Sequence, residues 1–369
     1  MSFRVIYVGL DVHKESIQVA IIDDSGEARQ YGKIPNRTSA IDKMIRKLQS
    51  QGPCSLKFIY EAGPCGYGLF RYLKSKGLEC MVVAPSLIPK RSGDRIKNDR
   101  RDAMNLCRLF RAGELTVIQV PTEEDEAMRD LVRARDDAKS AERKAKQRLK
   151  AFLLRHGIRY SGRSQWSVAH MKWLADIAMD HPAQQIALQE YIDTLKELMD
   201  RVSRLTEQIR ELVPSWSKAP VVLALQCLRG ISLINASVIV SEIGDFRRFA
   251  HPKDLMIYLG LIPSENTSGD NVNRGGITKT GNHFVRKALT EAAWAYRMPA
   301  RVSSILLKRQ EGSPQAVREI SWKAQVRLCS RYKKFIAKGK VKQVTVTAVA
   351  RELAGFIWAA AMEVVPEAN

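Results

Sequence analysis

Two short apolar runs that each lead into an acidic residue constrain the fold of this chain more than any other feature. Residues 5–10 precede Asp11 and residues 56–60 precede Glu61, and both runs are rich in β-branched and aromatic residues. Runs of this kind predict buried strands. A carboxylate at the end of a buried strand is costly to desolvate unless it pairs or binds a cation, so both acids are candidate functional residues.

Asp99 and Asp102 extend this acidic set. They stand three residues apart in a charged segment that predicts a helix over residues 99–112. Residues at this spacing share one helix face, so both carboxylates can point towards the strand ends. Carboxylate and water ligands suit Mg²⁺, and two such ions can stabilise the attacking and leaving oxygens of phosphoryl transfer. Four converging acids in a very basic protein therefore suggest a Mg²⁺ site that acts on phosphodiesters.

The first 120 residues alternate strand and helix signals. The pattern predicts strands over residues 5–10, 17–22, 31–34, 56–60 and 79–84, and helices over residues 39–51, 66–77 and 99–112. A hairpin meander followed by strands that alternate with helices is the order of a ribonuclease H-like α/β domain. We therefore expect residues 1–120 to form such a domain, with the acids at strand ends and on one late helix.

The charge of the chain indicates a polyanionic partner. The 369 residues carry a net charge of +21. Between Arg274 and Lys342 there are seventeen Lys or Arg residues against three acids, so this stretch contributes +14. Solubility or an anionic membrane surface could use such charge, but a concentrated basic stretch favours nucleic-acid binding.

Cysteine usage and hydropathy favour a cytoplasmic protein. The six cysteines are scattered and form no Cys-x-x-Cys pair, which argues against a zinc site or a disulfide framework. The first residues do not resemble a signal peptide. No uncharged apolar stretch reaches the ~18 residues that a membrane span needs. We therefore expect a soluble, intracellular protein.

Residues 121–214 predict a long helical region. Its first part is highly charged, and residues 143–155 contain six basic residues and no acid. Its second part carries apolar residues at alternating spacings of three and four: Leu188, Tyr191, Leu195, Leu198, Val202, Leu205, Ile209 and Leu212. This heptad seam fits an amphipathic helix inside one bundle, or a coiled-coil hairpin through which protomers associate. We favour the second interpretation.

Residues 215–369 predict a third, mainly helical domain. Residues 228–244 resemble a helix-hairpin-helix segment, whose turn could offer backbone N–H groups to phosphates or could serve packing alone. A polar, glycine-rich loop is expected over residues 263–281, and it contains Ser264 and Ser268.

Two sets of motifs, in this order along the chain, resemble one protein family. The first set is Gly9-Leu-Asp-Val-His-Lys14, Tyr60-Glu-Ala-Gly63 and Lys97-Asn-Asp-Arg-Arg-Asp-Ala103. The second set is Leu259-Gly-Leu-Ile-Pro-Ser-Glu-Asn-Thr-Ser-Gly269, Gly275-Gly-Ile-Thr-Lys-Thr-Gly-Asn282 and Arg286-Lys-Ala-Leu289. Jointly they resemble the IS-one-ten (IS110) family of insertion-sequence transposases, also called DEDD transposases, to which the Piv-type DNA invertases are related. The resemblance covers nearly the whole chain.

The resemblance implies a fold and a mechanism. It places the four acids Asp11, Glu61, Asp99 and Asp102 in a RuvC-like domain that binds Mg²⁺, and it makes Ser268, before Gly269, the nucleophile. Ser264 is the alternative serine, but it lacks the following glycine. A composite centre from different subunits would then recombine the DNA ends of the element with a target through a 5′-phosphoserine link. The family further implies a guide RNA encoded by the element and a homo-oligomer, either a dimer or a tetramer.

Basic residues in three segments are candidate nucleic-acid contacts. They are Lys279, Arg286, Lys287, Arg143, Lys146, Lys150, Lys338 and Lys340. Their division between RNA and DNA stays open, because both ligands present the same phosphates.

Three other functions are compatible with parts of the sequence. A RuvC-like junction nuclease would cleave by metal-activated water and leave Ser268 without a chemical role. A non-catalytic nucleic-acid-binding protein would have lost its metal, which the complete acid set argues against. A sugar-kinase-like ATPase shares the broad strand order, but convincing phosphate-binding loops are missing and the basic C-terminal half would be unexplained.

Overall fold

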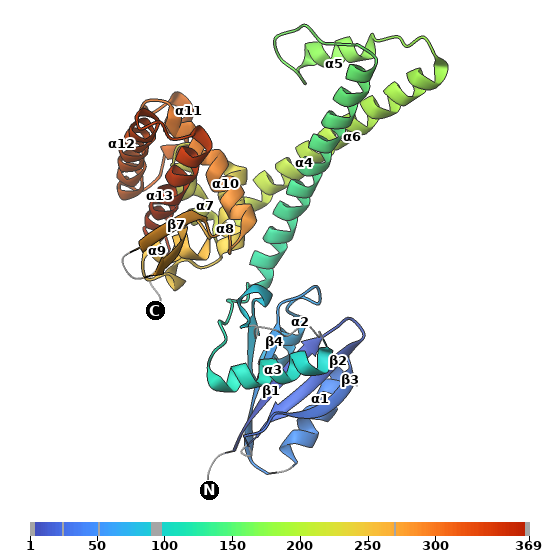
Figure 1. Cartoon of the computed structure of the whole chain (residues 1–369), viewed down its shortest axis with the longest axis vertical. Helices are drawn as coiled ribbons and strands as arrows, with labels where there is room; N and C mark the ends of the chain where they lie inside the picture. Colours follow the sequence, from blue (N-terminus) through green and yellow to red (C-terminus); the bar gives the residue numbers. More distant parts are fainter. Residues whose placement is uncertain (1–3, 24–25, 51, 90–97, 269–270, 366–369) are drawn as a thin grey trace. The chain divides into compact units, whose positions relative to one another are not determined.

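The computed structural model describes residues 4–23, 26–50, 52–89, 98–268 and 271–365. The chain divides into two compact units, Met1–Val120 and Pro121–Asn369 (Figure 1). The predicted helical middle and the predicted C-terminal domain both fall within the second unit.

The first unit is a mixed α/β domain built on a five-stranded sheet with the strand order β3-β2-β1-β4-β5. The strands are β1 (Arg4–Val12), β2 (Ser16–Ile22), β3 (Arg29–Pro35), β4 (Cys54–Glu61) and β5 (Glu79–Val83). The helices are α1 (Thr38–Gln49), α2 (Gly68–Ser75), the 3₁₀ turn η1 (Pro85–Leu87) and α3 (Asp99–Ala112). Strands β1, β2 and β3 form an antiparallel meander, whereas β1, β4 and β5 run parallel. The predicted order of elements is confirmed.

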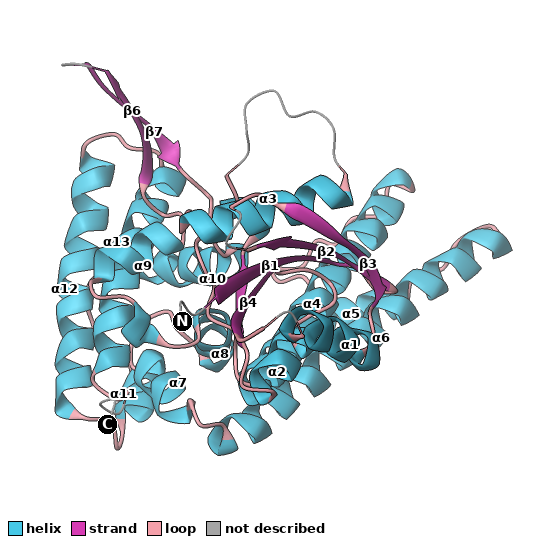
Figure 2. Cartoon of the chain, turned by 90° about the horizontal axis from the view of Figure 1, so that it is seen from below, coloured by secondary structure: helices cyan, strands magenta, loops and turns pink. Residues whose placement is uncertain are grey.

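Helices cover both faces of this sheet (Figure 2). Side chains alternate between faces along a strand, so Ile6, Val8 and Leu10 of β1 pack with the buried residues of α1 and α2. The opposite face packs against α3, where Ala103 and Cys107 are fully buried.

Gly9 lets α3 lie directly on β1. A Cβ at this position would stand 2.5 Å from the carbonyl oxygen of Ala103 and 2.8 Å from the backbone nitrogen of Cys107. The thiol of Cys107 in turn donates to the carbonyl oxygen of Tyr7 at 3.1 Å. Because only glycine leaves room for this approach, the choice of residue at position 9 sets the distance between helix and sheet.

The second unit is mainly helical. Its helices are α4 (Glu123–Arg155), α5 (Val168–Ala175), α6 (Pro182–Leu212), α7 (Ala219–Gln226), α8 (Leu233–Ile243), α9 (Pro252–Tyr258), α10 (His283–Ala293), α11 (Ser304–Gln310), α12 (Gln315–Ala337) and α13 (Lys342–Met362). Short 3₁₀ turns occur at η2 (Val213–Ser215), η3 (Phe246–Arg248) and η4 (Trp294–Arg297). The strands β6 (Pro263–Ser268) and β7 (Asn271–Ile277) form a separate two-stranded sheet.

Helices α4 and α6 pack against each other as a long hairpin (Figure 1). Every second member of the predicted heptad seam is buried within the chain: Leu188, Leu195, Val202 and Ile209. The intervening members Tyr191, Leu198 and Leu205 are only partly buried, and Leu212 is 45% exposed. The helical hairpin is therefore present, while association of protomers through it stays a prediction.

Residues 263–277 form a β-hairpin where the sequence suggested a loop. Strands β6 and β7 pair antiparallel, with Thr267 opposite Val272 and Ser268 opposite Asn271. The described side chains of residues 264–266 and 273–276 are exposed. Where the described residues of both strands are exposed, apolar and polar residues do not alternate, so the sequence carries no strand signal.

Helix α13 is long and apolar enough to cross a membrane by length and composition. Half of its most apolar window is nevertheless buried inside the unit. Val346, Val349, Leu353 and Ile357 belong to the large core that α7–α10 and α12 also line. These properties are typical of the central helix of a water-soluble core.

We predict that Gly9→Ala destabilises the first unit by about 1–3 kcal/mol, since the added methyl group overlaps the backbone of α3. Urea unfolding followed by circular dichroism measures this loss. Gly68→Ala is the matched control, because a Cβ at Gly68 meets no atom within 4 Å. Alanine at this first residue of α2 should be neutral or stabilising, by up to about 1 kcal/mol. Equal stability of the two variants would contradict the close approach of α3 to β1.

Candidate metal centre and nucleic-acid interface

The four predicted acids line one pocket of about 740 Å³ in the first unit. Asp11 is the penultimate residue of β1, and Glu61 ends β4. The parallel register pairs Leu10 with Tyr60, so the two acids that follow emerge at the same edge of the sheet. The structure thus brings together residues that are separated by up to 91 positions in the sequence.

The other two acids, Asp99 and Asp102, lie on helix α3. The side chain of Asn98 caps the helix by accepting a hydrogen bond from the backbone N–H of Arg100 at 3.0 Å. Asp99 and Asp102 lie in the first turn, where the helix dipole favours negative charge. The docking of α3 at Gly9 then places this first turn beside the end of β1.

His13 lies in the same pocket as the four acids, and the sequence analysis did not predict a role for it. Its Nε2 lies 3.1 Å from Oδ2 of Asp11 and 3.6 Å from Oδ2 of Asp99. One ligand atom from each of these three residues can lie within 4.8 Å of the others, a separation that suits a shared metal ion. The signal in the sequence was the Asp-x-His spacing at the strand end, since residues two apart in a strand share a face.

Burial raises the pKa of the Asp11 carboxyl group above its ordinary value. The ion pair with His13 opposes this shift and lowers the pKa, whereas the negative charges of Asp99 and Asp102 raise it further. A carboxylate that is half buried beside two other acids is stabilised by a cation in the same pocket.

The donor set fits a divalent cation. Carboxylate oxygens prevail in the pocket, and His13 adds one imidazole nitrogen. Carboxylates with water suit Mg²⁺ or Mn²⁺, and an imidazole is also compatible with Mn²⁺ and Zn²⁺. Asp11, Glu61, Asp99 and Asp102 are the residues that could hold such an ion.

Ser268 is the last residue of β6, in the second unit. Its backbone is paired with Asn271, while its side chain and the whole of Gly269 lie outside the described part of the chain. The alternative residue, Ser264, donates its hydroxyl across the hairpin to the carbonyl oxygen of Gly276 at 3.1 Å.

Two glycines fix the base of this hairpin. Gly260 has a positive φ of +62°, and a Cβ there would stand 2.6 Å from the backbone nitrogen of Thr280. A Cβ at Gly281 would overlap the carbonyl oxygen of Tyr258. The glycines of the Leu259-Gly and Thr280-Gly motifs are therefore required because two backbone segments touch at this point.

A buried acid, Glu242 of α8, connects the base of the hairpin to α4. Arg133 donates to both of its carboxylate oxygens, at 2.7 and 2.9 Å, and Asn282 donates at 2.6 Å. Asn282 also caps α10 by accepting from the backbone N–H of Phe284 and Val285. The sequence signal for this positioning residue was an acid inside an otherwise apolar helix.

The predicted basic contacts fall into two groups. Several have partners within the chain: Arg286 donates to the carbonyls of Leu259 and Gly281, Lys287 pairs with Asp136, Lys146 with Glu142, and Lys150 donates to Gln165. The side chains of Arg143 and Lys338 are exposed, Lys340 lies over the ring of Phe335, and Lys279 is exposed with a positive φ of 58°. The second group is the more accessible to phosphates.

Two family profiles match the chain. One, described as a transposase, matches residues 8–158 and so includes the four acids. The other, described as a transposase of the IS116/IS110/IS902 family, matches residues 223–304 and includes Ser268. The four acids and the serine therefore stand in separately matched segments.

Several curated proteins are similar over most of their length. A protein of Sinorhizobium fredii named "Putative transposase y4qE" is 47% identical over 98% of this chain and 90% of its own. The transposase for insertion sequence element IS1533 of Leptospira borgpetersenii is 33% identical over 91% of this chain and 98% of its own. The transposase for element IS1328 of Yersinia enterocolitica is 25% identical, covering 79% and 84% of the two chains.

We predict that Asp11→Asn and Asp102→Asn each weaken Mn²⁺ binding at least about tenfold, since each removes a charged ligand from the shared pocket. Isothermal titration calorimetry on the full chain measures the affinity. Glu79→Gln serves as the control, because Glu79 pairs with Lys57 at 3.1 Å and does not line the pocket. Equal affinities in all three variants would contradict the assignment of these acids.

The raised pKa of Asp11 has a consequence for stability without metal. The folded state disfavours the ionised form of the Asp11 carboxyl group. The ionised group therefore lowers the free energy of unfolding at pH values above the raised pKa of the folded state, and this effect is absent well below the ordinary pKa of 3.8. Asp11→Asn should therefore stabilise the metal-free protein at pH 7 and leave its stability unchanged near pH 3.

Urea unfolding in EDTA at the two pH values tests this expectation. The expectation would be contradicted if the free energies of unfolding of wild type and Asp11→Asn differed more at pH 3 than at pH 7.

Proposed function

Because the chain belongs to the IS116/IS110/IS902 family of transposases, we propose that it cuts and rejoins DNA as a metal-dependent serine recombinase. The observation that supports this proposal best is the convergence of Asp11, Glu61, Asp99 and Asp102 on one pocket. The DNA substrates would be the ends of an insertion sequence and its target. We expect the protein to act in the bacterial cytoplasm, at the nucleoid.

The four carboxylates would hold Mg²⁺ in this proposal. A bound Mg²⁺ would polarise the scissile phosphate and stabilise negative charge on the departing oxygen. Asp11 contributes through its position at the strand end, and His13 holds its carboxylate at 3.1 Å. Asp99 and Asp102 contribute through their places in the first turn of α3.

Ser268 would form the covalent link. Its Oγ attacks the phosphorus, the P–O bond to the 3′ oxygen breaks, and the 3′ oxygen takes up a proton as the serine loses one. The phosphodiester energy is kept in the 5′-phosphoserine bond, so that attack by another 3′-hydroxyl rejoins strands without ATP. The chain contains no Gly-x-x-x-x-Gly-Lys-Ser/Thr loop, which agrees with a reaction that needs no nucleotide.

The rigid base of the β6–β7 hairpin supports Ser268 rather than Ser264 as the nucleophile. Gly260, Gly281 and the Glu242 network hold the hairpin base, and Ser268 stands at its far end. Ser264 stands near the base, and its hydroxyl is already hydrogen-bonded to Gly276.

A guide RNA and a homo-oligomer complete the proposal. The run of six basic residues over positions 143–155 lies on the second half of α4, and Arg143 is exposed there. On α6 the partly buried members of the heptad seam, Tyr191, Leu198 and Leu205, keep some exposed apolar surface that a second protomer could cover. Paired cuts require paired sites, so a dimer or a tetramer is expected.

We predict that cells carrying the native element accumulate a covalent protein–DNA adduct with wild type but not with Ser268→Ala or Asp11→Asn. DNA is recovered under denaturing conditions and assayed for attached protein, and mass spectrometry identifies the modified serine. Expression in the presence of the native locus supplies any RNA that the element encodes.

Ser264→Ala is the matched control, because it removes a hydroxyl from the same hairpin. It should leave the adduct in place. DNA cleavage without any adduct would contradict the serine mechanism and would favour a RuvC-like nuclease that uses water.

A further inference from the structure

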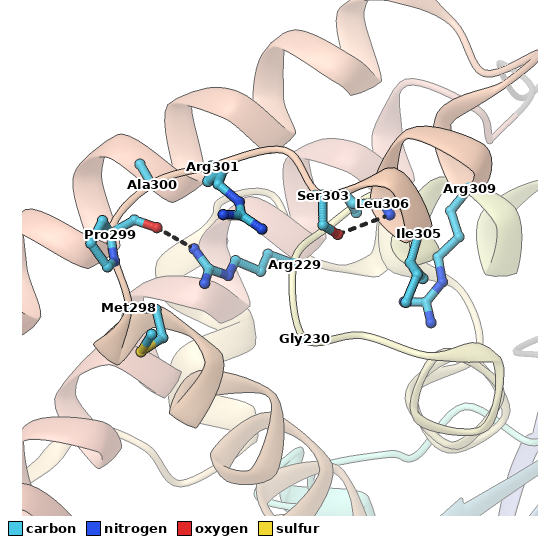
Figure 3. Close-up of a pocket in the computed structure, with 10 residues that line it drawn as sticks. All are labelled: Arg229, Gly230, Met298, Pro299, Ala300, Arg301, Ser303, Ile305, Leu306 and Arg309. Carbon is cyan, nitrogen blue, oxygen red and sulfur yellow. Dashed lines mark hydrogen bonds between the residues drawn. The ribbon is translucent and has the colours of Figure 1, made fainter.

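A second pocket, of about 530 Å³, lies within the second unit (Figure 3). One wall is the turn between α7 and α8, with Arg229 and Gly230. The other is the segment from η4 into α11, with Arg301 and Arg309. Neither the metal centre nor the serine accounts for it.

The pocket is cationic. Its lining contains three arginines and no acidic residue. From Ala292 to Gln310 the sequence has four basic residues and no Asp or Glu. Among the residues that the structure describes, no acidic side chain forms an ion pair with Arg229, Arg301 or Arg309. Three guanidinium groups around one cavity without acids favour an anionic ligand.

The two walls are fixed to each other by hydrogen bonds. Arg229 donates through Nη1 to the carbonyl oxygen of Pro299 at 2.7 Å and to Oε1 of Gln325 at 3.3 Å (Figure 3). The same fully buried Gln325 oxygen accepts from the backbone N–H of Arg301 at 3.1 Å. The pocket is therefore preformed, which lowers the entropic cost of binding.

Gly230 fixes the turn itself. It has a positive φ of +85°, and a Cβ there would lie 2.3 Å from the carbonyl oxygen of Ala292. The turn is thereby held against the C-terminal end of α10, and Arg229 points across the pocket towards Pro299 (Figure 3).

The three arginines keep guanidinium N–H groups that the described hydrogen bonds do not use. A guanidinium group carries five N–H donors. The described hydrogen bonds of the Arg229 side chain use Nη1, and that of Arg309 uses Nη1 towards the carbonyl of Ile231 at 3.1 Å. The side chain of Arg301 is exposed and makes no hydrogen bond within the described ranges.

The rest of the lining is apolar and accessible. Met298 is 54% exposed and Ile305 is 65% exposed, although both are large hydrophobic residues. Exposed apolar surface next to arginines matches the chemistry of a nucleotide, which has a charged phosphate and a flat, largely apolar base face.

We propose that this pocket binds one nucleotide of a single-stranded nucleic acid, with the phosphate on the arginines and the base against Met298 and Ile305. A cavity of 530 Å³ lies in the size range of small-molecule sites and admits one nucleotide rather than a duplex. The proposal rests on the family's action on nucleic acid and is independent of the serine mechanism.

The test measures fluorescence anisotropy of labelled oligothymidine and oligouridine with the full chain. Arg301→Ala should weaken binding about tenfold, the loss expected for a charge-assisted hydrogen bond. Lys308→Ala is the matched control, because it removes the same charge from an exposed residue of α11 outside the pocket. It should weaken binding no more than about twofold, the effect of one distant charge. Arg301→Lys should fall between the two, since lysine keeps the charge but loses the planar fork.

The outcomes separate the sources of the strand. A tenfold loss of affinity for oligothymidine alone identifies DNA as the ligand, and a tenfold loss for oligouridine alone identifies RNA. A loss for both supports a site that does not distinguish ribose from deoxyribose. Equal effects of Arg301→Ala and Lys308→Ala, or the same loss with duplex DNA, would overturn the proposal. Circular dichroism checks that the variants fold.

A second measurement tests whether the base of the bound nucleotide lies against Met298. Photocrosslinking with 4-thiouridine or 4-thiothymidine oligonucleotides should label the peptide that contains Met298, and labelling confined to other peptides would overturn the placement. The binding and crosslinking assays need neither DNA cleavage nor a covalent adduct, so a failure of the metal or serine mechanism leaves this test intact.

Discussion

The contact between α3 and β1 at Gly9 is the constraint on which the proposed metal centre depends. Without a side chain at Gly9, the backbone of α3 approaches the strand closely enough for a Cβ to fall 2.5 Å from the carbonyl of Ala103. This approach brings Asp99 and Asp102 into the pocket that Asp11 and Glu61 line. A local property of one residue therefore decides whether four acids from three elements can share a cation.

The second unit depends on a comparable constraint. Glu242 is buried in an apolar helix, and its desolvation is offset by Arg133 and Asn282. Since Asn282 also caps α10, this charge joins α4, α8 and α10 at the base of the β6–β7 hairpin. Buried charges of this kind favour one arrangement of the chain over others, and here that arrangement presents Ser268 at the end of a fixed hairpin.

The sequence predicted the strands and helices of the first unit because their patterns are local. Buried strands such as residues 56–60 read as continuous apolar runs, and the four acids were visible at their ends. His13 was missed because its distance of 3.6 Å from Asp99 arises only when α3 docks on the sheet. The hairpin over residues 263–277 was missed because its described residues 264–266 and 273–276 are exposed, so apolar and polar residues do not alternate there. The arginine pocket joins residues 72 positions apart in the chain, from Arg229 to Arg301, which no spacing rule reveals.

The central claim is that the four acids form one metal centre, and anomalous diffraction from crystals of the full chain grown with Mn²⁺ tests it most directly. The account predicts an anomalous peak within coordination distance, about 2.1 Å, of carboxylate oxygens of Asp11 and of at least one acid on α3. A peak elsewhere in the chain, or none in this pocket at saturating Mn²⁺, would contradict it.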